Sequence, residues 1–274
     1  MLYVEPEQIW DHIKTETHKL IKSEPMLASF YHTTLLNHND LGHALSYMLS
    51  NKLASSIIPE TTLHEIIEDA YYNDQSIITS AAYDIYATRH RDPTVDKYST
   101  PILYLKGFHA LQSHRIAHWL WNTGRRNLAI YFQNVTSTSF SVDIHPAAKL
   151  GKGIMLDHAT GIVIGETTTI ADNVSILQSV TLGSTGKTNG DRHPKIREWV
   201  MIGAGAKILG NIEIGRWAKI GAGSVVLHPV EPHTTVAGVP ASIISKTQNN
   251  NMQTIQIDQH FNKVFQGFEF GDGI

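Results

Sequence analysis

The sequence predicts an α+β fold, in which an N-terminal α-helical bundle is followed by a left-handed parallel β-helix. Two observations predict it. In residues 1–140, apolar side chains recur at the three- and four-residue spacing of amphipathic helices. In residues 141–245, aliphatic residues instead recur every six positions, a period that neither a helix nor an ordinary strand produces. Residues 246–274 follow neither pattern and are expected to form a flexible tail.

Capping signals place the helices of the first half. Asp40 is expected to cap a helix ahead of an apolar stripe, and Thr62 with Glu65 forms a capping box for the next helix. A threonine-proline pair predicts a helix over residues 101–122 with proline at its first position. A last helix is expected over about 125–137.

The second half contains three runs of aliphatic residues in the six-residue period, and the phase slips by two between the first and second runs. The runs are Ile144, Leu150, Leu156 and Ile162, then Ile164, Ile170, Ile176 and Leu182, and finally Ile202, Ile208, Ile214, Ile220 and Val226. Each group of six residues is expected to form a short strand and a turn, and three groups form one triangular coil. A β-sandwich, the alternative, would not keep these residues in phase. The left hand opposes the right-handed rule for parallel crossovers, and it comes from the known behaviour of hexapeptide repeats, not from the spacing.

The loop insertion 183–199 interrupts the repeat. It is polar and rich in glycine, and Asp191, Arg192 and His193 place three chemically capable side chains before the rigid Pro194. Loops of this length inside a compact domain are usually functional or disordered. We interpret the loop as functional, and the alternative is a tolerated surface insertion.

Composition excludes several classes of function. The sequence has no cysteine, which excludes disulfides, thiolate catalysis and a cysteine-rich zinc site. Its formal net charge of −3 gives no electrostatic case for a nucleic-acid ligand. No apolar run approaches the roughly 20 residues that span a bilayer, and the first residues lack the apolar stretch of a signal peptide. We therefore expect a cytoplasmic protein that binds neither membranes nor nucleic acids.

Longer segments of the chain resemble the bacterial serine O-acetyltransferases, a family of hexapeptide-repeat acyltransferases. The similar segments are Arg91–Pro93, Asp143–Ala148, Leu156–Gly161, Ser175–Gly183, Gly190–Ile196, Ala237–Ala241 and Gly271–Ile274. The resemblance covers nearly the whole chain and is more specific than the repeat alone, which also marks sugar acyltransferases and β-helical carbonic anhydrases. The chain departs from the family's pattern at Ser184, Trp199 and Trp217, where glycine is expected.

The resemblance implies transfer of an acetyl group from acetyl-CoA to the hydroxyl of L-serine, the first step of cysteine biosynthesis from serine. His158 is the expected general base, because a neutral imidazole can take the hydroxyl proton and return it to the CoA thiolate. Asp143 is expected to orient His158, since a coil of about 18 residues brings positions 15 apart near one another. The alternative role of His158 is that of a polar turn residue. Transfer is expected to be direct, because the chain has neither a cysteine nor a serine in a nucleophile elbow.

L-Serine is a zwitterion, so both of its charges need a partner. Arg192 is the expected donor to the carboxylate, and Asp92 and Asp157 are the expected partners of the ammonium group. His193 is expected to hydrogen-bond the substrate or the tetrahedral oxyanion. The alternative role of Asp92 is that of a helix cap, because it precedes a proline in the break between two helices.

Acetyl-CoA is expected to lie as co-substrate in the groove between solenoids, with no permanently bound cofactor and no metal. The candidate contacts are Gly183, Gly203, Ala204, Gly221 and Ala222, with Lys219 near the phosphates. Small residues allow the close approach of a ligand to the main chain. The alternative is that these residues only satisfy the turns of a structural β-helix.

The resemblance also implies assembly and regulation. Solenoids of this type form homotrimers with shared sites, and the family pairs two trimers through the helical halves, which makes residues 1–140 an oligomerisation domain of a hexamer. L-Cysteine is the expected feedback inhibitor, since it replaces the reacting oxygen of serine with sulfur. Ile274, with its free carboxylate, is the expected anchor for O-acetylserine sulfhydrylase (cysteine synthase).

Three other functions remain as alternatives. A zinc carbonic anhydrase on the same solenoid needs three convergent histidines. The solenoid histidines are His145, His158, His193, His228 and His233. A sugar acyltransferase would differ in its acceptor, and a regulatory scaffold would bind the sulfhydrylase while Trp199 and Trp217 block the groove. The spacing of His158 and His193, with the loop around Arg192, favours the serine acetyltransferase.

Overall fold

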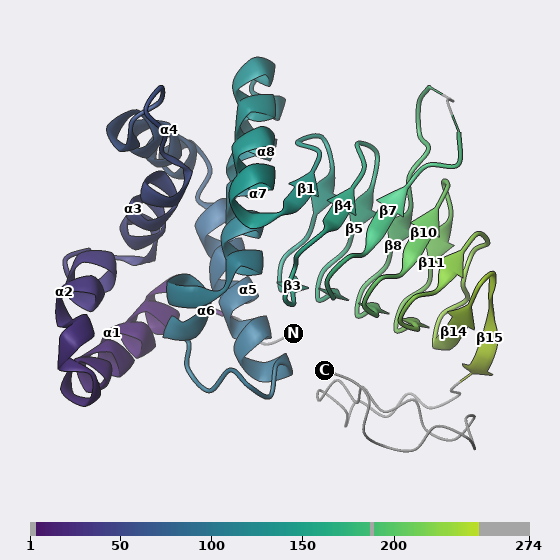
Figure 1. The fold of residues 1–274 in the computed structure, drawn as a ribbon, viewed down its shortest axis with the longest axis horizontal. Coiled ribbons are helices and arrows are strands. Elements are labelled where there is room, and N and C mark those ends of the chain that lie inside the picture. The colour runs from purple at the N-terminus through teal and green to yellow at the C-terminus, as the bar shows by residue number, and fades with distance from the viewer. Residues whose placement is uncertain (1–3, 187–188, 247–274) are drawn as a thin grey trace.

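The computed structural model describes residues 4–186 and 189–246, which form a helical half and a solenoid that extends away from it (Figure 1). The helices are α1 (Pro6–Ser23), α2 (Ala28–Tyr31), α3 (Leu41–Leu53), α4 (Glu60–Asn73), α5 (Ser76–Arg91), α6 (Ser99–Tyr104), α7 (Lys106–Asn122) and α8 (Arg126–Phe140), with short helical turns η1 (Pro25–Leu27) and η2 (His32–Leu36). None of the helices in these ranges is long and apolar enough to cross a bilayer.

Three of the predicted helix boundaries can be compared with the structure. The Asp40 cap is confirmed, since its carboxylate accepts a hydrogen bond of 2.9 Å from the main-chain N–H of His43. The predicted capping box is wrong, because α4 begins at Glu60, directly after the extended Pro59, and Thr62 lies inside the first turn. The predicted helix over residues 101–122 is two helices, α6 and α7, because Leu105 adopts an extended conformation between them.

α7 joins the helical half to the solenoid. Every residue from Gly107 to Ala117 is buried, which explains why no single apolar stripe marks this helix in the sequence. Figure 1 shows α7 and α8 beside the first coil, and α5 also contacts that coil at β3. The apolar core runs without interruption from the helices into the solenoid. The two halves are therefore packed as one body.

The solenoid has three faces, each made of strands from successive coils. Face A has the order β1-β4-β7-β10-β13, face B the order β11-β8-β5-β2, and face C the order β15-β14-β12-β9-β6-β3. The strands are β1 (Val142–Ile144), β2 (Lys149–Leu150), β3 (Met155–Leu156), β4 (Ile162–Ile164), β5 (Thr169–Ile170), β6 (Ser175–Ile176), β7 (Thr181–Gly183), β8 (Lys195–Ile196), β9 (Met201–Ile202), β10 (Lys207–Leu209), β11 (Glu213–Ile214), β12 (Lys219–Ile220), β13 (Val225–Val226), β14 (Thr234–Gly238) and β15 (Ala241–Lys246).

Turns connect the faces along three edges. The C–A edge consists of the turns 157–161, 177–180, 203–206 and 221–224. The A–B edge consists of 145–148, 165–168, 184–194 and 210–212, of which 187–188 lie outside the described residues. The B–C edge consists of 151–154, 171–174, 197–200, 215–218 and 231–233.

Strand register shows where the repeat is irregular. Ile164 pairs with Leu182, 18 positions on, whereas Ile144 pairs with Ile164, 20 positions on. The two extra residues lie in the turn 157–161 and account for the predicted phase slip. Leu182 pairs with Ile208, 26 positions on, and the eight extra residues lie in the turn 184–194. Both irregularities coincide with segments that contain candidate site residues.

The last strand of the solenoid pairs differently from the others. The six-residue pattern ends after Pro240, yet β15 continues the sheet by pairing antiparallel with β14. The side chains of β15 are half-buried or exposed, so its sequence lacks the buried aliphatic residues that mark the other coils. Residues 247–274 of the predicted tail, including Ile274, lie outside the described residues.

Candidate active site

His158 lies in the turn 157–161 on the C–A edge. The backbones of His158, Ala159 and Gly161 are in the left-handed region, with φ of 52°, 63° and 79°. Such conformations cost energy for residues with a Cβ and persist only where the surrounding structure enforces them. The two extra residues of this coil thus form a strained turn, and the His158 side chain is 73% exposed on it.

The turn 157–161 is held by contacts on both sides. The N–H of Gly161 donates to the carbonyl oxygen of Ser141 at 2.7 Å, and the Lys106 ammonium donates to the Thr160 hydroxyl. A Cβ added at Gly107 would lie 2.1 Å from the carbonyl oxygen of Leu156. The first turn of α7 therefore packs directly beneath this segment, and only glycine allows that approach.

Two carboxylates lie beside His158. Asp157 Oδ1 is 3.9 Å from His158 Nε2, and its side chain is 20% exposed. Burial raises the pKa of Asp157 and the charge of Asp92 raises it further, whereas His158 lowers it. Asp92 follows the end of α5, where its Oδ1 accepts hydrogen bonds from the N–H and hydroxyl of Thr94 at 2.8 and 2.7 Å. The alternative role of Asp92 as a helix cap is also present, because Asp92 is the C-cap residue of α5 and its N–H donates to the carbonyl oxygen of Thr88 at 3.0 Å. Its carboxylate and that of Asp157 together offer a site for a cation.

Arg192 lies on the A–B edge, where it is paired with Glu166. Its Nη2 is 2.6 Å from Glu166 Oε2, and its Nη1 donates to the carbonyl oxygen of Gly190 at 3.1 Å. This hydrogen bond lowers the pKa of Glu166. An incoming carboxylate would share or displace Glu166 as the partner of the guanidinium group.

His193 is buried on the same edge, with 6% exposure. Its Nδ1 accepts a hydrogen bond from the N–H of Thr167 at 3.2 Å, so the proton of the neutral ring is on Nε2. Thr167 Oγ1 also accepts from the N–H groups of Arg192 and His193 at 3.0 and 3.1 Å. Burial, followed by the charge of Arg192, lowers the pKa of His193. The arrangement leaves Nε2–H as a hydrogen-bond donor.

The sequence interpretation missed the residues that position these groups. Thr167 and Glu166 hold the Arg192–His193 pair, and Lys195 Nζ donates to the carbonyl oxygens of Thr167 and His193 at 2.6 and 3.0 Å. The signal for Glu166 and Thr167 was available, because the repeat places the turn 165–168 next to the turn 184–194 on one edge.

Asp143, on face A, has a partner other than the predicted one. Its Oδ1 accepts a hydrogen bond of 2.7 Å from Nε2 of Gln133 in α8. Its predicted pairing with His158 stays a prediction. Asp143 lies in the strand that separates the C–A edge from the A–B edge, so it is placed between the two groups of candidate residues.

The candidate residues of one chain form two groups instead of one. Asp157 and His158 lie at the C–A edge, with Asp92 of the helical half near Asp157, and Arg192 and His193 lie at the A–B edge. On face A, β4 separates the turn ending at Gly161 from the turn beginning at Gly165, a span of about 13 Å at the usual rise of a strand. One substrate of the size of serine does not bridge both edges of the same chain.

The candidate CoA residues lie mostly on the C–A edge. The N–H of Gly223 donates to the carbonyl oxygen of Ala204 at 2.7 Å, which stacks the turn containing Gly221 and Ala222 on the turn containing Gly203. Further hydrogen bonds continue this edge to the turn 157–161. A Cβ at Gly203 would lie 2.7 Å from the N atom of Ala222, so this glycine is required by coil stacking alone. Ala204 is half-buried and Ala222 is exposed, so both are accessible along the edge.

The other two CoA candidates, Lys219 and Gly183, lie outside the stacked turns of the C–A edge. Lys219 begins β12 on face C, directly after a turn of the B–C edge, and Gly183 ends β7, next to the A–B edge. Within residues 4–186 and 189–246, no three histidine, aspartate or glutamate side chains lie close enough to hold a metal ion.

Comparisons with known proteins match both halves of the chain. Residues 9–113 match the family model described as serine acetyltransferase, N-terminal, and residues 193–228 match the bacterial transferase hexapeptide model of six repeats. A serine acetyltransferase of Salmonella typhimurium is 68% identical over 270 residues, which are 98% of either chain.

Two solved structures of serine acetyltransferases are similar in fold. One, in complex with cysteine, has a TM-score of 0.87 and 64% identity and covers 88% of this chain and 100% of its own. The other, in complex with CoA, has a TM-score of 0.85 and 62% identity, with the same coverage of both chains.

Proposed function

The chain belongs to the serine acetyltransferase family of acyltransferases, and we propose that His158 is the general base of the transfer. The imidazole takes the proton of the serine hydroxyl as its oxygen attacks the thioester carbonyl of acetyl-CoA. The tetrahedral intermediate collapses with cleavage of the C–S bond, and the proton passes to the CoA thiolate. The products are O-acetyl-L-serine and CoA. The observation that supports this role most strongly is the exposed imidazole on a strained turn beside Asp157.

The substrate's two charges account for the other polar residues. Asp92 and Asp157 bind the ammonium group, and Arg192 binds the carboxylate through its fork of N–H donors. His193 is neutral near pH 7, and its Nε2–H donates to the oxyanion that forms during attack. Asp143 orients His158 after release from Gln133.

A complete site needs two copies of the chain. The C–A edge of one copy supplies the base and the ammonium site, and the A–B edge of a neighbour supplies Arg192 and His193. The separation of these edges in a single chain supports this assignment. Cyclic repetition of one such contact gives a closed ring, and the resemblance to the family makes this ring a trimer. The helical halves of two trimers pair to give a hexamer.

Acetyl-CoA lies along the C–A edge, past Ala204 and Ala222, in the groove between two solenoids. The CoA complex of the similar structure supports this co-substrate, and the use of acetyl-CoA supports the expected cytoplasmic location. The cysteine complex of the other structure supports L-cysteine as a ligand, and its likeness to serine supports binding by the same clamp of Arg192 and the two aspartates. Ile274 and its carboxylate anchor O-acetylserine sulfhydrylase, a role that rests on the resemblance of the tail.

The test is release of CoA thiol from acetyl-CoA with L-serine, comparing the wild type with His158→Ala. Loss of a general base lowers kcat at least about 100-fold. His228→Ala is the matched control, since His228 is exposed on the solenoid away from the C–A edge. A kcat of His158→Ala within tenfold of the wild type contradicts the assignment of the base. Wild-type protein without serine-dependent turnover contradicts the reaction itself.

A further inference from the structure

The B–C edge contains a column of left-handed residues, one in each coil. They are Gly153, Asn173, Trp199, Trp217 and His233, with φ of 68°, 63°, 62°, 62° and 57°. This backbone region favours glycine and tolerates asparagine, whereas a bulky side chain there is strained. The two tryptophans stand where the family's pattern has glycine. Their presence therefore requires a compensating interaction.

The two indole rings stack in register with the coils. Trp199 and Trp217 have centroids 4.8 Å apart and planes 4° from parallel, and Trp217 is stacked on His233 at 6.5 Å and 15°. Neighbouring strands of a sheet lie about 4.8 Å apart, so rings at the same position of successive coils meet at stacking distance. The left-handed conformation is what points both rings along this edge.

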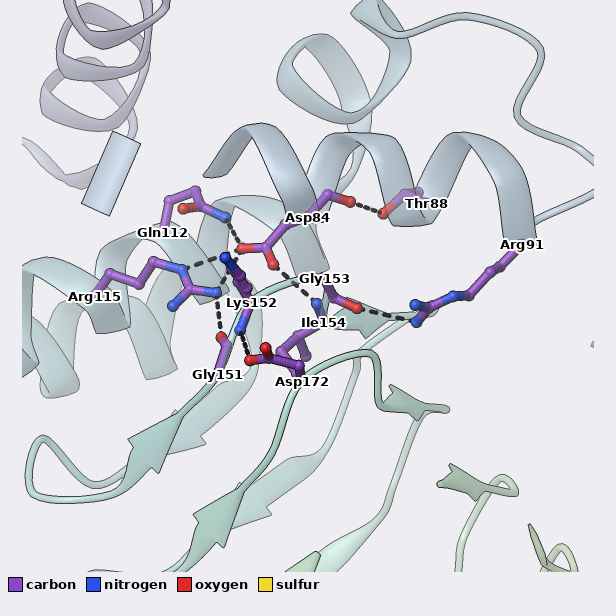
Figure 2. A network of polar contacts seen from close by, with 10 residues as sticks. All are labelled: Asp84, Thr88, Arg91, Gln112, Arg115, Gly151, Lys152, Gly153, Ile154 and Asp172. Carbon is purple, nitrogen blue, oxygen red and sulfur yellow. Dashed lines mark hydrogen bonds and ion pairs between the residues drawn. The ribbon is translucent and has the colours of Figure 1, made fainter. Parts of the chain in front are cut away.

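Arg91, the last residue of α5, rests on the free end of the column. Its Cζ is 5.2 Å from the centroid of the Trp199 ring. Its Nη1 donates to the carbonyl oxygen of Gly153 at 3.0 Å and to Ser175 Oγ at 3.3 Å, and its Nη2 donates to Asn173 Oδ1 at 2.9 Å. Figure 2 shows the side chain reaching from α5 to Gly153.

The Arg91 cation is stabilised without an ion pair. The guanidinium group is buried, and among the described residues no carboxylate lies within 4 Å of it. Burial lowers the pKa of Arg91 to about 10. The face of an aromatic ring attracts a cation most strongly where water is excluded. The charge of Asp84 also favours the Arg91 cation, and the Trp199 ring adds to this stabilisation.

We propose that Trp199 and Trp217 are positioning residues for the ammonium site, acting through Arg91 on the adjacent Asp92. Asp92 is the first residue after α5, and the residue before it, Arg91, is tied to the solenoid by side-chain hydrogen bonds. The stack fixes the guanidinium group, and the guanidinium group fixes where Asp92 lies relative to Asp157. This inference rests on the proposed role of Asp92 as a partner of the substrate ammonium.

The test is the kinetics of Trp199→Gly, with Trp217→Gly as a second variant. Glycine adopts φ near +62° without strain, so both variants keep the fold, which circular dichroism checks. Trp199→Gly is expected to raise the KM for L-serine and the inhibition constant of L-cysteine about 3- to 10-fold, with kcat and the KM for acetyl-CoA within about twofold of the wild type. Trp217→Gly is expected to shift the same two constants in the same direction by less. Trp199→Phe, which keeps a ring, restores most of the wild-type value.

A double-mutant cycle with Arg91→Lys tests whether Trp199 acts on the KM for L-serine through Arg91. Lysine keeps the charge and loses the fork, so in its background Trp199→Gly should add no further change to the KM for L-serine. Additive effects, an unchanged KM for L-serine in Trp199→Gly, or equal changes in the KM of both substrates would each overturn the inference. Asp92→Asn distinguishes a failure of the proposed role of Asp92 from a failure of the inference about the tryptophans. If it leaves the KM for L-serine unchanged, the proposed role of Asp92 fails, and if only the tryptophan variants are silent, the inference alone fails.

Discussion

Asp84 Oδ2 and Arg115 Nη2 lie 2.7 Å apart in a buried ion pair that joins α5, α7 and the first coil of the solenoid (Figure 2). The Asp84 side chain has no exposed surface. Its Oδ1 accepts from the N–H of Ile154 at 2.9 Å, and Arg115 also donates to the carbonyl oxygen of Gly151 at 2.8 Å. Two buried side chains of the helical half thus hydrogen-bond to the main chain of the turn 151–154 on the B–C edge.

Asp84→Asn is expected to destabilise the protein strongly. Removing one partner leaves the other charge buried without compensation, at a cost of about 3–5 kcal/mol. Urea unfolding followed by circular dichroism measures the change. The matched control is Asp69→Asn, which breaks the exposed pair with Arg125 and should cost less than about 1 kcal/mol. Equal losses in the two variants would show that the buried pair has no special role.

Gly165→Ala is expected to disable His193 without unfolding the chain. A Cβ at position 165 would lie 2.1 Å from Cδ2 and Nε2 of the imidazole, so the ring must move. A misplacement of about 1 Å costs up to about 100-fold in rate, and we expect kcat/KM for L-serine to fall about 10- to 100-fold. Gly186→Ala is the control, because nothing lies within 4 Å of a Cβ there. Wild-type kinetics for Gly165→Ala would argue against a role for the His193 ring.

Two inactive variants are expected to restore activity when they assemble together. If each site takes His158 from one copy and His193 from its neighbour, a random mixture of His158→Ala and His193→Ala chains contains intact sites. In a cyclic assembly with equal amounts of both chains, about a quarter of the sites are intact. Co-expression followed by the thiol-release assay measures this. Activity no higher than the mean of the two parents would place the whole site within one chain.

Stability is expected to fall as the pH falls from about 6.5 toward 4, in part because of His109. Burial lowers the pKa of this histidine from 6.5 to about 4. The unfolded chain then binds more protons than the folded chain in this window, so acid favours unfolding, by at most about 3 kcal/mol. Urea midpoints between pH 7 and 4.5 should fall less steeply for His109→Gln than for the wild type. Parallel slopes would contradict this assignment.

The sequence predicted the fold well because the solenoid has one strong signal. A buried aliphatic residue every sixth position is confirmed by strand pairs such as Ile164 with Leu182, and the family is confirmed by the relatives. The antiparallel pairing of β15 with β14 was not predicted, because the exposed side chains of β15 show no six-residue pattern. The entry into α4 was missed because the extended Pro59, not a capping side chain, sets where that helix begins.

The candidate site was predicted as a set of residues but not as a geometry. Glu166 and Thr167 act through contacts between turns 26 positions apart, which depend on the exact length of an insertion. The stacking of Trp199 on Trp217 depends on a backbone conformation that the residue type disfavours, so no propensity rule predicts it. Pairing of Asp143 with His158 stays a prediction, since Asp143 contacts Gln133 in the single chain.

The solenoid departs from its regular coil length in two segments, the turn 157–161 and the turn 184–194. His158 and His193 are on segments added to the regular coil, and the coil between them sets their spacing. Beyond β13 the solenoid can be lengthened by whole coils of 18 residues without changing the distance between these two turns. The same chain could therefore be extended as a modular scaffold, with its reactive turns left untouched at the other end.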